Sequence, residues 1–462
     1  MAVALAVAPA GLERALRQAV RRARSRGEAL AAVTLTVGPD VDPAEVMFAS
    51  RRPGEPFYVF EQPDRERRAL AALGCVRALE ASGPDRFARV SEEWRALAGG
   101  AVADEGLVAV GGFAFAPDGG GAPHWQGFAP ASLHVPEVAL ARRGDEVRLT
   151  LAARATPDDT PEDLLARLER RLAELRSTPL PLLDPLPTER ARVASVMPPE
   201  HYEAAVARAV ERIRAGELQK LVLAREVAVH AAAPHDVAAV HGVLRQAFGS
   251  CFVFAVGRGD AAFIAASPEL LLRRDGMRLS TMALAGSTRR SADPAVDDHL
   301  GERLRTSAKD RSEHDIVIGR IERTLRPHAV WVAAAEEPVV VRVANIQHLA
   351  TPVRAQLIRP RGAVELAGIM HPTPAVGAEP LAVGAPLIPA LEGLDRGWYA
   401  GPVGWTDANE DGEWCVALRC ALVRGRDARC YAGVGVVADS DPAAELVETE
   451  IKLEALLPVL AG

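Results

Sequence analysis

The chain has 462 residues, of which 49% are hydrophobic and 25% charged, a globular composition with enough apolar material for a sizeable core. Its formal net charge of −7 argues against nucleic acid or an anionic membrane as a bulk partner, so an anionic ligand needs a local basic cluster. The five cysteines are odd in number and form no CxxC pair, which favours a reducing cytoplasm over a disulfide framework or a zinc site.

The first 190 residues carry few chemical signals. The apolar stretch at residues 1–10 precedes its arginines, the reverse of a signal peptide, and no apolar run approaches the ~18 residues of a membrane span, so we expect a soluble protein. A strand broken by glycines is predicted at residues 108–115 and a helix at residues 160–176. Four prolines then mark a boundary: Pro179, Pro181, Pro185 and Pro187. We expect residues 1–190 to complete the fold of residues 195–462.

The second part alternates helices with short strands. Helical spacing predicts a helix at residues 199–216, and strands are predicted at 220–229, 251–256, 261–266, 270–273 and 277–284, joined as an antiparallel meander. A long helix at 299–325 interrupts the strands, which resume at 339–343, 414–423 and 429–437. Asp441 and Pro442 then open a C-terminal helix. This order predicts an α+β layered sandwich.

Two residues have the chemistry of a base and an acid. Lys220 precedes the apolar run at residues 221–224, and a lysine held against apolar surface loses its proton more easily and can then act as a base on water. The alternative is a strand-edge lysine with its ammonium in solvent. Glu269 lies between two apolar strand segments, where a carboxylic acid stays protonated and can donate a proton. A solvent-exposed turn glutamate is the alternative.

Two helices carry carboxylates suited to a metal ion. Glu445, Glu448 and Lys452 share one face of the C-terminal helix, although a solvated face with an i,i+4 pair would look the same. The long helix carries a dense charged segment at residues 307–315, which is also typical of surface. Mg²⁺ takes one or two carboxylates and leaves positions for water and an anionic substrate. One glutamate from each helix would satisfy it.

Arg419 interrupts an apolar strand, and a buried guanidinium needs an anion: either a carboxylate ligand or a structural ion pair. Gly433 and Gly435 lie in the strand before the C-terminal helix, where they permit close approach of a ligand to the backbone. His348 has a loop-like setting and is weak evidence alone.

Together these segments resemble the chorismate-binding enzymes, a family of isochorismate synthases, salicylate synthases and the synthase components for anthranilate and aminodeoxychorismate. The resemblance covers about residues 195–460. It rests on segments in the family's order: 219–225 (QKLVLAR), 267–270 (SPEL), 284–287 (LAGS), 307–314 (SAKDRSEH), 347–349 (QHL), 371–377 (HPTPAVG), 399–404 (YAGPVG), 432–435 (AGVG), and Glu448 with Lys452.

The resemblance implies a large layered α/β/β/α sandwich with two mostly antiparallel sheets and the active site between sheets and helices. It implies Mg²⁺ as cofactor, held by Glu313 and Glu448 with Glu445 nearby through water, and chorismate as substrate. The implied catalytic residues are Lys220, Glu269 and His348. The implied substrate-binding residues are Gly286, Ser287, Ala375, Tyr399, Arg419, Gly433 and Lys452.

The resemblance also favours one reaction. Lys220 matches the lysine that activates water, whereas anthranilate synthases carry glutamine there; aminodeoxychorismate synthases carry a nucleophilic lysine where this chain has Ala285. Ala375 replaces a threonine typical of pyruvate-removing members. We therefore expect a cytoplasmic isochorismate synthase, monomeric or a weak homodimer, for menaquinone or catecholate siderophore biosynthesis. The alternatives are a salicylate synthase and a non-catalytic chorismate-binding regulatory protein.

The expected mechanism uses the two groups of opposite character. Neutral Lys220 takes a proton from water, which attacks C2 of chorismate, and protonated Glu269 delivers a proton to the departing C4 hydroxyl. Mg²⁺ and the basic pocket fix the orientation of the substrate.

Overall fold

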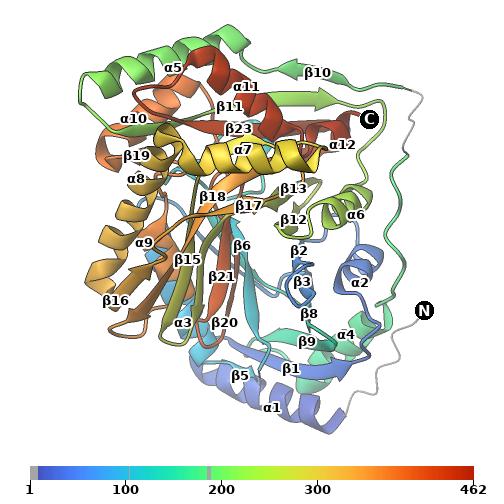
Figure 1. Cartoon of the computed structure of the whole chain (residues 1–462). Helices are drawn as coiled ribbons and strands as arrows, with labels where there is room; N and C mark the ends of the chain where they lie inside the picture. Colours follow the sequence, from blue (N-terminus) through green and yellow to red (C-terminus); the bar gives the residue numbers. More distant parts are fainter. Residues whose placement is uncertain (1–8, 104, 185–188) are drawn as a thin grey trace.

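The computed structural model describes residues 9–103, 105–184 and 189–462 (Figure 1). Two of the predicted boundary prolines, Pro185 and Pro187, and most of the apolar stretch at the start of the chain lie outside these residues. In the described part, no helix combines the length and the apolar character needed to cross a membrane.

The elements before residue 190 are α1 (Pro9–Arg26), β1 (Ala29–Val37), α2 (Pro43–Ser50), β2 (Phe57–Gln62), β3 (Arg68–Leu73), β4 (Arg77–Ala81), α3 (Arg86–Gly99), β5 (Val102–Ala103), β6 (Val108–Phe113), η1 (Pro123–Trp125), β7 (Ala131–Val135), β8 (Val138–Arg143), β9 (Glu146–Ala155) and α4 (Pro161–Ala173). The η elements are 3₁₀ turns.

The elements after residue 190 are β10 (Arg192–Ser195), α5 (Pro199–Arg214), β11 (Lys220–His230), α6 (Val237–Ala247), β12 (Phe252–Arg258), β13 (Ala261–Ser267), β14 (Leu270–Asp275), β15 (Arg278–Arg289), α7 (Pro294–Thr306), α8 (Ala308–Leu325), η2 (Arg326–His328), β16 (Ala329–Ala334), β17 (Val339–Arg342), β18 (Ile346–Leu357), α9 (Ala363–Met370), β19 (Ala378–Glu379), α10 (Leu381–Glu392), β20 (Pro402–Asp407), β21 (Gly412–Val416), β22 (Cys420–Arg424), β23 (Asp427–Val436), α11 (Pro442–Leu453) and α12 (Leu457–Ala461).

Two large sheets face each other. The first has the strand order β10-β11-β23-β22-β13-β12-β2-β3-β8-β9-β1-β5, with β19 beside β11, and the second has the order β16-β18-β15-β14-β21-β20-β6-β7-β4, with β17 beside β18. Among the described strands, β1 and β5 pair in parallel and the other neighbours are antiparallel. Both sheets draw strands from before and after residue 190. The apolar core between them includes Phe254 and Phe263 from the first sheet and Val403 and Trp414 from the second.

Helices cover both outer faces (Figure 1). Helices α1, α2, α4, α6 and α12 pack on the first sheet over a separate apolar core, and α5 and α11 pack against each other over β11 and β23. Helices α3, α8 and α9 cover the second sheet. The predicted α/β/β/α sandwich is therefore confirmed.

Three predicted elements differ from the structure. The predicted helix at residues 299–325 is two helices, because Ser307 adopts an extended conformation and its side chain accepts a hydrogen bond from the Asp310 amide as the N-cap of α8. The predicted strand at residues 414–423 is also two strands, because the chain passes from one sheet to the other between them, at Arg419, which has φ 49°. The predicted meander holds only for the pairs β12–β13 and β14–β15, since β11 and β12 are not neighbours and β13 and β14 belong to different sheets.

Two of the places where the chain crosses between the sheets lie next to each other. One crossing joins β13 to β14 and ends at Glu269, and the other joins β21 to β22 and ends at Arg419. The crossings are hydrogen-bonded to each other: the Ala266 amide donates to the Arg419 carbonyl (3.1 Å), and the Val416 amide donates to the Glu269 carbonyl (3.0 Å). This arrangement fixes a carboxyl group and a guanidinium beside each other in the space between the sheets.

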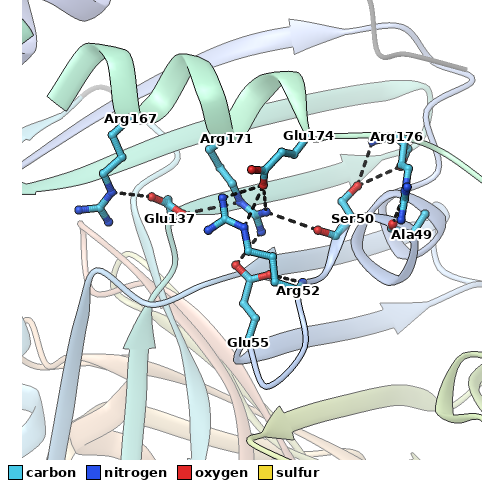
Figure 2. A network of polar contacts seen from close by, with 9 residues as sticks. All are labelled: Ala49, Ser50, Arg52, Glu55, Glu137, Arg167, Arg171, Glu174 and Arg176. Atoms are coloured by element: carbon cyan, nitrogen blue, oxygen red, sulfur yellow. Dashed lines mark hydrogen bonds and ion pairs between the residues drawn. The ribbon is translucent and has the colours of Figure 1, made fainter. Parts of the chain in front are cut away.

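A polar network ties α4 to the first sheet (Figure 2). Arg171, whose side chain is 1% exposed, lies 2.7 Å from Glu55 and 3.6 Å from Glu137, and it also pairs with Glu174. Arg167 adds a second contact to Glu137 at 3.0 Å. Because the carboxylates of Glu55 and Glu137 are themselves largely buried, this guanidinium compensates charge that would otherwise be unpaired.

Candidate active site

A cavity lies between the sheets, next to α8 and α11. All the predicted site residues line it except Lys220 and Glu445: Glu269, Gly286, Ser287, Glu313, His348, Ala375, Tyr399, Arg419, Gly433, Glu448 and Lys452. A larger hollow opens beside β10, where His230 pairs with Asp427 and Arg429 pairs with Glu226. The cavity between the sheets is therefore the candidate active site.

Lys220 is fully buried at the start of β11, so the alternative of a solvated strand-edge lysine is wrong. Its Nζ lies 2.8 Å from Oε1 of Glu313 on α8. Gly435 on the neighbouring strand makes room for this pair, since a Cβ at that position would lie 2.6 Å from Cε of Lys220. A lysine that acts as a base needs an amine without a close carboxylate, but here Glu313, a predicted metal ligand, contacts the amine.

Glu269 is buried at the crossing between the sheets, 3% exposed. Burial raises the pKa of this carboxyl to about 8, although the cations of Lys220, Arg419 and Lys452 lower it. The group therefore holds its proton near neutral pH, as a general acid requires. The alternative of a turn glutamate in solvent is wrong.

Arg419 is buried without a carboxylate partner among the described residues. Its Nη2 lies 2.9 Å from Nε2 of His348, whose Nδ1 lies 3.3 Å from the Gly286 carbonyl oxygen, and its Nε makes no hydrogen bond. Burial lowers the pKa of Arg419, and burial together with Arg419 lowers the pKa of His348 well below its usual value. The neutral imidazole thus accepts from the guanidinium and leaves its charge uncompensated, which suits an anionic ligand.

The predicted loop position of His348 is wrong, because His348 lies on β18, paired with Ser287 of β15. In this position its Nε2 contacts the guanidinium of Arg419, and its Nδ1 contacts the carbonyl oxygen of Gly286 on β15.

The three predicted metal ligands come together from two helices, and each carries a lysine counter-ion. The pairs are Glu313 with Lys220 (2.8 Å), Glu448 with Lys452 (2.8 Å) and Glu445 with Lys309 (2.9 Å). In the part of the chain that the structure describes, no three potential ligands already stand in metal-binding geometry. The donor set nevertheless fits Mg²⁺, since carboxylate oxygens on two facing helices are the ligands that this cation takes while it keeps water.

Glu448 stays ionised at the cavity wall. Burial by itself raises the pKa of this carboxyl, but the charge of Lys452 and hydrogen bonds from Lys452 and Ser287 bring the pKa below its usual value. Ser287 Oγ donates to Glu448 Oε1 at 2.8 Å, and Lys452 also donates to the Gly433 carbonyl at 2.9 Å. Ser287 thus orients a carboxylate in addition to lining the cavity.

The walls of the cavity depend on residues that the sequence analysis missed. Arg396 donates to the carbonyls of Val222 and Val376, both in the cavity lining, and forms an ion pair with Glu392. Glu392 in turn accepts a hydrogen bond from the Ala224 amide at 2.7 Å. The pair satisfies the edge of β11 between β19 and β10, where no strand lies. An Arg four residues after a Glu near a helix end was the available signal, but it is common on surfaces.

Comparison with known proteins decides the family. The profile of the chorismate binding enzyme family matches residues 14–461. The chain is a chorismate-binding enzyme. It is 37% identical to the salicylate biosynthesis isochorismate synthase of Pseudomonas aeruginosa over 97% of this chain and 94% of that protein. It is 32% identical to the isochorismate synthase MenF of Bacillus subtilis over 77% of this chain and 75% of that protein.

Solved structures agree with this placement. The menaquinone-specific isochorismate synthase MenF of Escherichia coli has a TM-score of 0.79 at 27% identity and covers 97% of this chain and 100% of its own. Anthranilate synthase component I of Streptococcus pneumoniae, with a TM-score of 0.60 at 18% identity over 92% of this chain and 91% of its own, shares the fold.

Proposed function

We propose that this chorismate-binding enzyme is an isochorismate synthase, which converts chorismate to isochorismate with Mg²⁺ as cofactor. The observation that carries the proposal is the gathering of three groups at one site: the buried carboxylic acid of Glu269 and the guanidinium of Arg419 line the cavity, and the buried side chain of Lys220 adjoins it. The names of the relatives, isochorismate synthases from three genera, support the same reaction.

In the proposed reaction, Lys220 removes a proton from water as the oxygen of that water bonds to C2 of the ring. The double bonds shift, the C4–O bond breaks, and Glu269 gives its proton to the leaving oxygen, which departs as water. Lys220 then returns one proton to Glu269 through solvent, so the net change is an isomerisation. Arg419 and Lys452 hold the substrate's carboxylates in the correct orientation.

Glu313 and Glu448 would hold Mg²⁺, with Glu445 nearby, and the bound cation would polarise the ring carboxylate of the substrate. Glu313 therefore has two possible partners. While it pairs with Lys220, the ammonium has no lone pair to offer, so Lys220 acts as a base only when Glu313 is engaged elsewhere.

Ala375 lines the cavity with a methyl group, which offers no hydroxyl to assist removal of pyruvate. We therefore propose that isochorismate is released, for menaquinone or catecholate siderophore synthesis, rather than converted to salicylate.

The test is purified protein with chorismate and Mg²⁺, with products separated by chromatography. Isochorismate should form, and Lys220→Ala should abolish turnover while chorismate still binds. Full activity in Lys220→Ala would refute the assignment of the base. Salicylate with pyruvate as the main products would favour the lyase alternative, and tight binding without any product would favour a regulatory protein.

A further inference from the structure

The sequence contains 54 lysines and arginines, but Lys220, Lys309 and Lys452 are its only lysines. Every other position that needs a long cationic side chain has arginine. All three lysines lie at the candidate site, and each forms an ion pair with a different one of the three proposed metal ligands. A chain that otherwise uses arginine has therefore kept lysine at the positions facing these carboxylates.

The difference between the two side chains gives a physical reason. The guanidinium of arginine is a rigid fork that binds a carboxylate through two hydrogen bonds, whereas the ammonium of lysine is a compact point charge on a flexible stem. A lysine can neutralise a carboxylate and then withdraw from it, while an arginine competes more firmly with any incoming cation.

Lys309 is the lysine to which the proposed reaction gives no role. Its Nζ donates to Glu445 Oε1 at 2.9 Å, and its side chain is 37% exposed, whereas the side chain of Glu445 is 2% exposed. The exposed partner of the pair is therefore the lysine, which has solvent to move into, and the buried partner is the carboxylate.

We propose that Lys309 is the resident counter-ion of the metal site: it neutralises Glu445 in the metal-free chain and releases this carboxylate when a divalent cation binds. This inference rests on the proposed function. Its consequence is a cation that binds less tightly than the three carboxylates alone would allow, and that exchanges readily. Lys309 is a positioning residue, since it acts through Glu445 and touches no reacting atom.

The experiment measures the affinity of the full chain for Mg²⁺ by isothermal titration calorimetry, without substrate. Lys309→Met should tighten binding by about 10-fold, because a unit charge a few ångströms from a cation near the protein surface contributes on the order of one decade in affinity. Lys309→Gln should change the affinity in the same direction. In Lys309→Arg the guanidinium can bind Glu445 through two hydrogen bonds, so this variant should bind Mg²⁺ more weakly than the wild type.

Arg305→Met is the matched control, because it removes one cation from an exposed ion pair with Glu302 on α7, and it should leave the affinity unchanged. Unchanged or weaker binding in Lys309→Met overturns the proposal, and so does tighter binding in Lys309→Arg. Chorismate turnover by the wild type is measured in parallel. Turnover together with a wrong order of affinities contradicts the role of Lys309 alone, whereas the expected order without turnover contradicts the proposed function.

Discussion

The protonated state of Glu269 gives the structure a measurable dependence of stability on pH. Burial raises the pKa of this carboxyl from 4.5 to about 8 in the folded chain. The folded state therefore binds the proton more tightly than the unfolded state. The resulting stabilisation is complete below the unfolded pKa and is lost as the pH rises through the folded pKa. Glu269→Gln keeps the shape of the protonated acid but cannot ionise, so the variant escapes this loss.

The size of the effect follows from the two pKa values. Between them, the free energy of unfolding falls by about 1.4 kcal/mol per pH unit through this one group, or about 2.5 kcal/mol from roughly pH 5.5 to roughly pH 7.5. Urea denaturation of wild type and Glu269→Gln at both pH values, without metal or substrate, measures the difference. Other titrating groups cancel because the two proteins share them.

We expect Glu269→Gln to gain about 2.5 kcal/mol relative to wild type over this range, and to lose turnover by at least about 100-fold at both pH values. Turnover by the wild type should fall as the pH rises above about 8, when the acid loses its proton. A constant difference in unfolding free energy between the two proteins would mean that Glu269 is already ionised at about pH 6, and the reasoning on the general acid would be wrong.

Three further variants test other parts of the structure. Arg419→Gln should raise the Kd for chorismate, measured by calorimetry, by about 10- to 100-fold. It should not lower Tm, because it removes a buried charge that has no carboxylate partner. An unchanged Kd would exclude an anion-binding role for Arg419. Gly435→Ala should reduce turnover strongly, since the new Cβ meets the Lys220 side chain at 2.6 Å, whereas Gly38→Ala, which meets nothing within 4 Å, should be neutral in the same assay. Arg171→Leu should lower the free energy of unfolding by about 3–5 kcal/mol in urea, because it leaves the buried carboxylate of Glu55 without its cation and Glu137 with Arg167 alone; a loss below 1 kcal/mol would contradict this.

The regular elements with a clear apolar period were predictable. Leucines at helical spacing placed α4, and the one-sided apolar face from Tyr202 to Ile213 placed α5, since each buries that face against its sheet. The apolar run after Lys220 placed β11. In each case, local periodicity and tertiary burial demand the same conformation.

The interruptions were not predictable from periodicity. Residues 414–423 are apolar apart from Arg419, and neither glycine nor proline marks the break between the two strands there, because the left-handed conformation is imposed by the crossing between the sheets. Polar residues concealed β18, where Gln347, His348 and Thr351 are buried through hydrogen bonds to distant groups. The break at Ser307 did have a signal, a serine three residues before an aspartate whose amide it caps.

The candidate site was predictable as a set of residues but not as a set of contacts. Eleven of the positions predicted from the motifs line one cavity, and Lys220 and Glu445 adjoin it. No spacing in the sequence, however, indicated which carboxylate would face which lysine. Those pairings depend on how α8 and α11 approach β11 and β23 across the two sheets, which is a long-range property of the fold.

Around the double crossing, strands made early in synthesis pair with strands made late, and this pairing limits when the chain can fold. β6, at residues 108–113, pairs with β20, at residues 402–407, and β13 finds its neighbour β22 only when residues 420–424 have been synthesised. A nascent chain on the ribosome therefore carries early strands with open edges until nearly all of it has emerged, and such edges recruit other strands. We therefore expect this protein to fold late and cooperatively, once its last strands have been made.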